Sequence, residues 1–74
     1  MTVVALFGAG GKMGMRLARN LARSRFETRH VEISPAGQER IREAFGSECV
    51  DPDAAIERAD VVILAVPDTA VGVV

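Results

Sequence analysis

Four glycines within seven residues are the first feature of this sequence that could support chemistry. Gly8, Gly10, Gly11 and Gly14 follow the apolar run of residues 3–7, VVALF, and lead into a segment of good helix formers. Glycines let a backbone turn sharply and approach a ligand, and the free N–H groups at a helix N-terminus can hold a phosphate. The pattern therefore indicates a nucleotide phosphate site, although the same glycines could form a plain structural turn.

The spacing of these glycines departs from the usual dinucleotide fingerprint. G-x-G-x-x-G would place its third glycine where Met13 stands. The variant G-x-x-G-x-x-G fits through Gly8, Gly11 and Gly14, and it has the same physical content. Lys12, in the first turn of the expected helix, could pair with a phosphate or be an ordinary exposed lysine, and the sequence favours neither.

Glu32 stands 18 residues after Gly14, near the end of the next expected strand, which is the spacing of a ribose-binding acid. A carboxylate there accepts hydrogen bonds from both adenosine ribose hydroxyls and repels a 2′-phosphate. No arginine immediately follows Glu32 to neutralise such a phosphate, so the sequence favours NAD over NADP. The alternative is a surface glutamate at a strand end.

A second loop is expected beside the glycine turn. Val66, Pro67 and Asp68 follow the apolar run of residues 61–66, VVILAV. The first and last strands of the expected sheet lie side by side, and ligands bind outside their carboxyl ends. Asp68 could accept a hydrogen bond from a ribose hydroxyl or cap the following helix, and these alternatives stay open.

The elements that must position these residues alternate along the chain. We expect strands at residues 3–7, 26–33 and 61–66, a brief strand at residues 47–50, and helices at residues 12–24, 35–45 and 52–59. The first helix should bury Met13, Leu17 and Leu21, and the second should turn Ile41, Ala44 and Phe45 inward; Gly10, Gly14 and Ala18 should form a small-residue stripe against the first strand. The fold class is therefore α/β, a Rossmann-type parallel sheet with flanking helices in the order β-α-β-α-β-α-β.

Ser34-Pro35 and Asp51-Pro52 supply a capping side chain followed by proline at the first position of the second and third helices. Gly46 should end the second helix.

Chain length, net charge and cysteine content narrow the class of protein. At 74 residues the chain is shorter than most domains, so we expect residues 1–74 to be the N-terminal portion of a dinucleotide-binding domain. A net charge of −1 indicates no nucleic-acid partner, and no run is long enough for a membrane span. Cys49 is the single cysteine, which excludes an intrachain disulfide, predicts no metal site and fits a cytoplasmic location. His30, the one histidine, is expected to be structural.

With these residues in view, the chain resembles the N-terminal domain of dehydrogenases related to 6-phosphogluconate dehydrogenase. G-x-x-G-x-M-G is their form of the turn, and it is matched by Gly8, Gly11, Met13 and Gly14. The resemblance is nearest to the D-apionate oxidoisomerase group, through the segments ALFGAGGKMG, VEISPAG and ADVVILAVPD, and it covers nearly the whole chain.

The resemblance implies an NAD-dependent enzyme that oxidises a hydroxyl of a small sugar acid such as D-apionate and couples this to isomerisation. It also implies a helical C-terminal domain, absent here, that supplies the catalytic groups and forms a homodimer, so no catalytic residue is assigned. Lys12, Met13 and Gly14 would lie at the pyrophosphate, Glu32 at the adenosine ribose and Asp68 near the other end of the cofactor. The alternatives are another dehydrogenase of the superfamily, of prephenate dehydrogenase or pyrroline-carboxylate reductase type, or a non-catalytic NAD-sensing domain.

Overall fold

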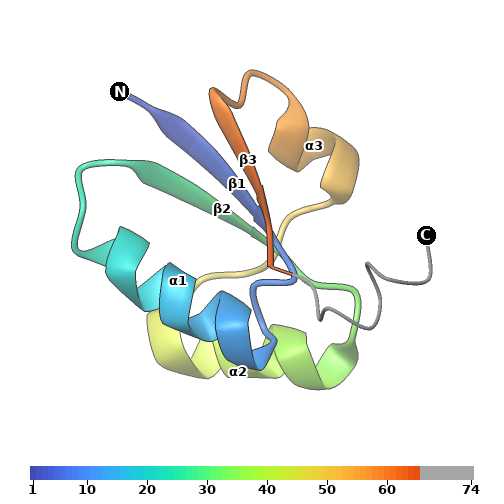
Figure 1. Cartoon of the computed structure of the whole chain (residues 1–74). Helices are drawn as coiled ribbons and strands as arrows, with labels where there is room; N and C mark the ends of the chain where they lie inside the picture. Colours follow the sequence, from blue (N-terminus) through green and yellow to red (C-terminus); the bar gives the residue numbers. More distant parts are fainter. Residues whose placement is uncertain (66–74) are drawn as a thin grey trace.

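The computed structural model describes residues 1–65 of the chain (Figure 1). Its elements in order are β1 (Val3–Phe7), α1 (Lys12–Ala22), β2 (Glu27–Val31), α2 (Pro35–Phe45), α3 (Pro52–Ile56) and β3 (Val61–Leu64). The three strands form one parallel sheet in the order β2-β1-β3. This arrangement confirms the α/β class, and it places the glycine turn after β1 at the centre of the sheet.

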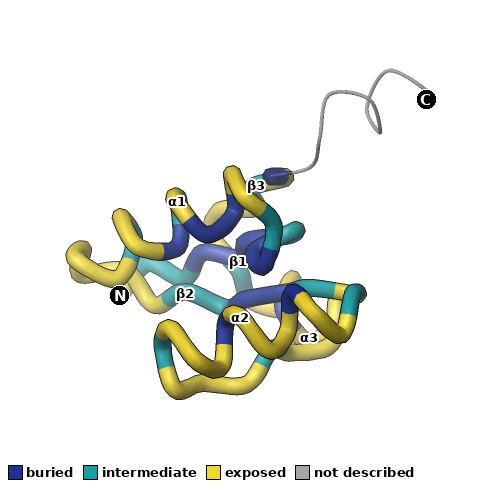
Figure 2. The backbone as a smooth tube through the Cα atoms, turned by 90° about the horizontal axis from the view of Figure 1, so that it is seen from below, coloured by how far each residue is buried: buried dark blue, intermediate teal, exposed yellow. Residues whose placement is uncertain are grey.

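β1 is the central strand because its side chains are apolar on both faces. Val4, Ala5 and Leu6 are almost fully buried. Leu6 belongs to a core cluster with residues of α1 and α2, whereas Ala5 packs with Val31 of β2 and Ala55 of α3. α1 and α2 therefore cover one face of the sheet and α3 the other, and in Figure 2 the buried stretches run along β1 and the inner sides of these helices.

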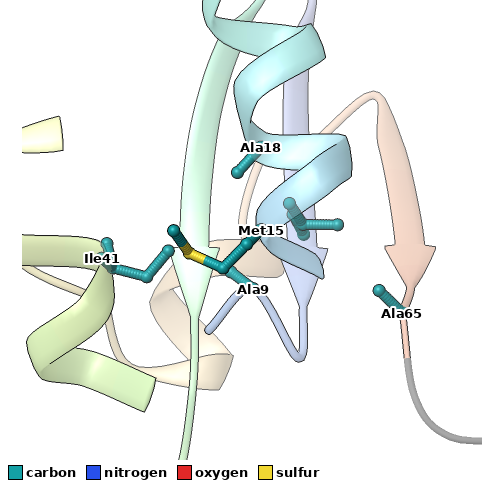
Figure 3. Close-up of a cluster of buried hydrophobic side chains, with 6 residues drawn as sticks. Ala9, Met15, Ala18, Ile41 and Ala65 are labelled. Carbon is teal, nitrogen blue, oxygen red and sulfur yellow. The ribbon is translucent and has the colours of Figure 1, made fainter. Parts of the chain in front are cut away.

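α1 meets the core through small residues and one methionine. Gly14, Met15 and Ala18 are its buried residues, and Leu17 and Leu21 pack at the edge of the cluster. In Figure 3, Met15 points from α1 toward Ile41 of α2. The prediction for Met13 was wrong: its side chain is 55% exposed, because the contact line of the helix passes through Gly14 and Ala18.

The helix ends of α2 and α3 follow the predictions from local sequence. Ser34 Oγ accepts a hydrogen bond from the Gly37 amide, and Pro35 occupies the first turn. Gly46 ends α2 with a φ of 68°, the left-handed conformation that favours glycine. Asp51 caps α3 in the same way as Ser34 caps α2, through the amide of Asp53. α3 is shorter than expected, ending at Ile56, and Ala44 of α2 is exposed rather than inward.

The predicted third strand at residues 47–50 does not form within residues 1–65. One backbone hydrogen bond joins this segment to the sheet, from the Val50 amide to the His30 carbonyl of β2 at 2.9 Å. A single bond makes no ladder, so the observed order is β-α-β-α-α-β.

β3 also differs from the expectation of a fully buried strand. Val61, Val62 and Leu64 are 44–67% exposed, because β3 pairs with β1 on one side and forms an edge of the sheet over the described residues.

Candidate nucleotide-binding site

A cavity of about 480 Å³ lies at the carboxyl ends of all three strands. It is lined by the last residues of β1 and β2, by residues that follow the three strands, by Arg40 of α2 and by Pro52 of α3; the full set is Phe7, Gly8, Gly11, Val31, Glu32, Ile33, Ser34, Arg40, Pro52 and Ala65. The carboxyl end of a parallel sheet, between loops of neighbouring strands, is where α/β proteins bind their ligands. Three of the predicted site residues, Gly8, Gly11 and Glu32, meet here.

The main chain of the glycine turn is fixed to the end of β2. The amides of Gly8 and Ala9 both donate to the Val31 carbonyl, at 2.9 and 3.1 Å. The Gly10 amide donates to Glu32 Oε1 at 2.9 Å, and the Gly11 amide donates to the Gly8 carbonyl at 3.1 Å. Each of these four consecutive amides therefore has a protein acceptor, and the turn is held rigidly before any ligand binds.

Backbone conformation accounts for one of the four glycines and close packing for two more. Gly8 has a φ of 77°, which side chains rarely adopt. A β-carbon on Gly10 would lie 2.4 Å from the Gly37 oxygen, and one on Gly14 would lie within 2 Å of the Gly8 oxygen. The predicted small-residue stripe thus forms in α1 through Gly14 and Ala18, whereas Gly10 contacts α2 instead of the first strand.

Gly11 has no such structural requirement. Its φ of −78° suits any residue, and the nearest atom to an added β-carbon is the Gly8 oxygen at 3.4 Å. Gly11 lines the cavity and is the N-cap of α1. A glycine at this position leaves room for a ligand to approach the main chain, which is the use of glycine in phosphate-binding turns.

The N-terminus of α1 is the place where an anion would be held. Within residues 1–65, α2 and α3 begin with a side chain that caps the first turn, whereas α1 has no side-chain cap and no acidic residue in its first turn. In the part of the chain that the structure describes, the amides of Lys12, Met13 and Gly14 therefore have no protein acceptor, which is the condition for binding an anion at a helix N-terminus. The side chains of Lys12 and Met13 are exposed.

Glu32 lies directly after β2 and links three parts of the site. Its Oε1 accepts from the Gly10 amide at 2.9 Å, and its Oε2 accepts from the Ser34 amide at 3.1 Å. Its side chain also packs on Gly37, where an added β-carbon would lie 2.5 Å from Glu32 Cγ. Each carboxylate oxygen has a second lone pair, so the group retains acceptor capacity toward the cavity. The acid predicted to bind the ribose thus lies at the cavity, beside the glycine turn.

Arg40 is a cavity residue that sequence reasoning missed. It stands eight residues after Glu32, in the second turn of α2, and its Nε donates to the Gly10 carbonyl at 2.7 Å. Gly37 and Ile41 are the buried residues of α2, and Arg40 adjoins them on the helix, which turns its side chain toward the glycine turn. The sequence could have indicated this position, because Arg40 stands three residues after Gly37 and one before Ile41, next to the buried face of the helix.

The other predicted residues stand apart from this cavity. Val66, Pro67 and Asp68 lie outside the described residues. The predicted structural role of His30 fits its surroundings, because the residue is buried and its ring stacks on Phe45 with ring centroids 5.2 Å apart. Burial lowers the pKa of His30, which agrees with a structural, uncharged side chain. Burial and the nearby Glu32 and Glu48 raise the pKa of the free Cys49 thiol.

Residues 3–72 match the family model described as the NAD binding domain of 6-phosphogluconate dehydrogenase. The chain belongs to this family. Membership in this family of NAD-binding domains confirms the Rossmann-type fold and NAD as the cofactor. The uncapped N-terminus of α1, the cavity-lining Gly11 and the carboxylate of Glu32 fit that cofactor chemically. Within residues 1–65, no helix is long and apolar enough to cross a membrane.

Two curated relatives of the chain are named D-apionate oxidoisomerase. The chain is 62% identical to that of Rhizobium rhizogenes over 97% of its own length, and 56% identical to that of Cupriavidus necator over 93%. The matched region covers 26% and 25% of those proteins. The chain thus spans about a quarter of the length of the curated relatives it matches.

Two solved structures have the same fold. A semialdehyde dehydrogenase NAD-binding protein from Cupriavidus necator, in complex with calcium and NAD, superposes with a TM-score of 0.89 at 54% identity over 97% of this chain and 26% of that one. An oxidoreductase from Jannaschia sp. CCS1 superposes with a TM-score of 0.83 at 41% identity over 95% of this chain and 25% of that one.

Proposed function

We propose that this chain binds the adenosine half of NAD for a larger oxidoreductase. In this proposal Glu32 accepts the ribose hydroxyls, and the amides of Lys12, Met13 and Gly14 hold the pyrophosphate. Gly8, Gly10 and Gly11 shape the turn between these two subsites. Val66, Pro67 and Asp68 are proposed for the remaining side of the cofactor, with Asp68 as a hydroxyl acceptor.

One observation supports this proposal above the others. Among the helices of residues 1–65, α1 is the one without a side-chain cap, and it begins directly after Gly11. Gly11 and Glu32 line the same cavity. An anion-binding end and a diol-accepting carboxylate are the two groups that adenosine diphosphate requires from a Rossmann domain. Glu32 is held by two main-chain amides, so a ribose would meet a carboxylate already oriented.

For the whole protein we propose oxidation, with isomerisation, of a small sugar acid such as D-apionate, as the names of the curated relatives suggest. NAD would accept the hydride, and this segment would position the cofactor against the substrate. Residues 1–74 would be the N-terminal portion of the dinucleotide-binding domain, followed by its remainder and a helical domain for substrate and dimerisation. A cytoplasmic location agrees with the single, free Cys49.

The test is a titration of the full-length protein with NADH and NADPH, repeated on Glu32→Ala. We expect tighter binding of NADH, and a preference reduced about tenfold by the substitution, because the carboxylate both binds the ribose and repels the 2′-phosphate. Glu43→Ala is the matched control, since Glu43 is an exposed carboxylate of α2. Failure of the wild type to bind either dinucleotide would disprove the proposal.

Turnover separates the enzyme from a sensor. An oxidoreductase reduces NAD when a suitable sugar acid is added, whereas an NAD sensor binds NADH without any substrate-dependent redox change. A panel of sugar acids that includes D-apionate, followed at the absorbance of NADH, also identifies the substrate class. Reduction with another carboxylic substrate and none with sugar acids would assign a different dehydrogenase of the family.

A further inference from the structure

We propose that Arg40 forms a latent 2′-phosphate site, which Glu32 keeps closed. The inference rests on the proposed function, because it assumes that the adenosine ribose lies at Glu32. It goes beyond that function by assigning a role in cofactor choice to a residue of α2. Removal of the Glu32 charge should then open the site to NADPH, but only while Arg40 is present.

The side chains of Arg40 and Glu32 form hydrogen bonds with the same residue of the glycine turn, Gly10. The Gly10 amide donates to Glu32 Oε1 at 2.9 Å, and the Gly10 carbonyl accepts from Arg40 Nε at 2.7 Å. Both side chains line the cavity of about 480 Å³. A ribose held by Glu32 would therefore have the Arg40 guanidinium close to the same edge of the cavity.

The guanidinium retains donors for a ligand. Its Nε is used by Gly10, and within residues 1–65 its two terminal nitrogens form neither a hydrogen bond nor an ion pair. Arginine presents these donors in a planar fork that matches a phosphate. Ile33, which immediately follows Glu32 and also lines the cavity, has no polar group that could take this part.

The sign of the local charge decides which dinucleotide fits. With Glu32 ionised, the carboxylate and guanidinium offset each other, and a doubly charged 2′-phosphate would lie against the carboxylate. Without the carboxylate charge, the same edge carries a net positive charge with open donors. Arg40 thus explains how a single change at position 32 could convert the site, although no arginine stands beside Glu32 in the sequence.

The experiment measures NADH and NADPH dissociation constants for four forms of the full-length protein: wild type, Glu32→Gln, Arg40→Gln and the double variant. Glutamine at position 32 keeps one oxygen for the Gly10 amide but places an NH2 group where Oε2 accepts from the Ser34 amide, so the Ser34 bond is lost in Glu32→Gln and in the double variant alike. Glutamine at position 40 places an N–H donor where Arg40 Nε stands, which retains the bond to the Gly10 carbonyl. The readout is the ratio of the two constants in each form. Loosening of the turn would weaken both dinucleotides and leave this ratio unchanged.

We expect Glu32→Gln to shift the ratio toward NADPH by about tenfold, and Arg40→Gln in that background to abolish the shift. The NADPH gain should also weaken as salt is added, since it depends on charge. Arg23→Gln, which removes the same charge at the far end of α1, should leave the gain intact.

Two results would overturn the role of Arg40. One is an equal NADPH gain in Glu32→Gln and in the double variant, and the other is no gain in Glu32→Gln at all. If the double variant does not fold, Arg40→Lys in the Glu32→Gln background replaces it, and the fork geometry of arginine predicts a partial loss of the gain. Failure of the proposed function looks different, because the wild type would then bind neither dinucleotide.

Discussion

A β-carbon placed on Gly10 would lie 2.4 Å from the main-chain oxygen of Gly37. The glycine turn after β1 and the first turn of α2 are therefore in backbone contact, 27 residues apart in the chain. Ser34 caps the same turn of α2 through the Gly37 amide, and Glu32 packs on Gly37. The contact joins the two halves of the candidate site into one rigid unit.

Gly10→Ala should destabilise the fold. The added methyl group meets backbone atoms of Gly37, which cannot move aside as a flexible side chain would. Overpacking of this kind costs about 1–3 kcal/mol, and we expect the free energy of unfolding to fall by that amount. Chemical denaturation monitored by circular dichroism measures it. Wild-type stability in this variant would show that the turn and α2 are not in contact.

Gly11→Ala should separate binding from stability. The backbone conformation at Gly11 suits alanine, and the nearest protein atom is 3.4 Å from the new methyl carbon. We expect the free energy of unfolding to fall by about 1 kcal/mol at most, because alanine is a poorer N-cap than glycine, while NADH binding weakens about tenfold or more. Thermal unfolding and NADH titration of the same sample test both parts. Unchanged NADH affinity would mean that the cofactor does not approach Gly11.

Arg29 should be important for the position of α3. From β2, its Nη1 donates to the carbonyls of Ala54 and Ala55 at 3.1 Å each, and to that of Glu57. These bonds satisfy carbonyls at the C-terminal end of α3, which have no partner within the helix. Arg29→Met should therefore lower the free energy of unfolding by about 1–3 kcal/mol, measured by urea denaturation.

Arg23→Met is the control for this effect, because Arg23 is exposed at the end of α1. Equal stability of the Arg29 and Arg23 variants would contradict the anchoring role.

Acid should weaken the fold through His30. Its pKa is lowered by burial from the ordinary value of 6.5, so the unfolded chain binds a proton at a higher pH than the folded chain does. The free energy of unfolding should therefore be highest above pH 6.5 and fall as the pH drops through the lowered pKa. Since His30 is the only histidine, denaturation curves from about pH 7.5 to about pH 5 report on it directly.

His30→Phe should keep the stacking on Phe45 and flatten the pH dependence over this range. An unchanged slope in that variant would assign the effect to other groups.

Features that depend on neighbouring residues were predictable from the sequence. The strand at residues 3–7, the Ser34 and Asp51 caps, the Gly46 stop and the acid after β2 all have local causes: an unbroken apolar run, a capping oxygen before proline, or a required positive φ. The placement of β1 beside β3 also followed, because alternating strands and helices restrict the order of a parallel sheet.

Other features were decided by tertiary structure, since they depend on distances across the chain. Met13 is exposed because Gly14 and Ala18 occupy the contact line of α1, which the repeat of apolar residues does not reveal. Residues 47–50 have a strand-like composition but make a single hydrogen bond to β2. Strand formation requires a partner in register, and composition alone cannot supply one.

The cofactor site divides in the same way. The sequence by itself determined that the glycine turn and the acid would lie together at the end of the sheet, because their spacing along one β-α-β unit fixes where they meet. Only the tertiary structure showed that Gly10 is a packing residue while Gly11 faces the cavity, and that Arg40 joins Glu32 on the same turn. These relationships depend on how closely α2 approaches the turn, which is set by packing between helices rather than by local sequence.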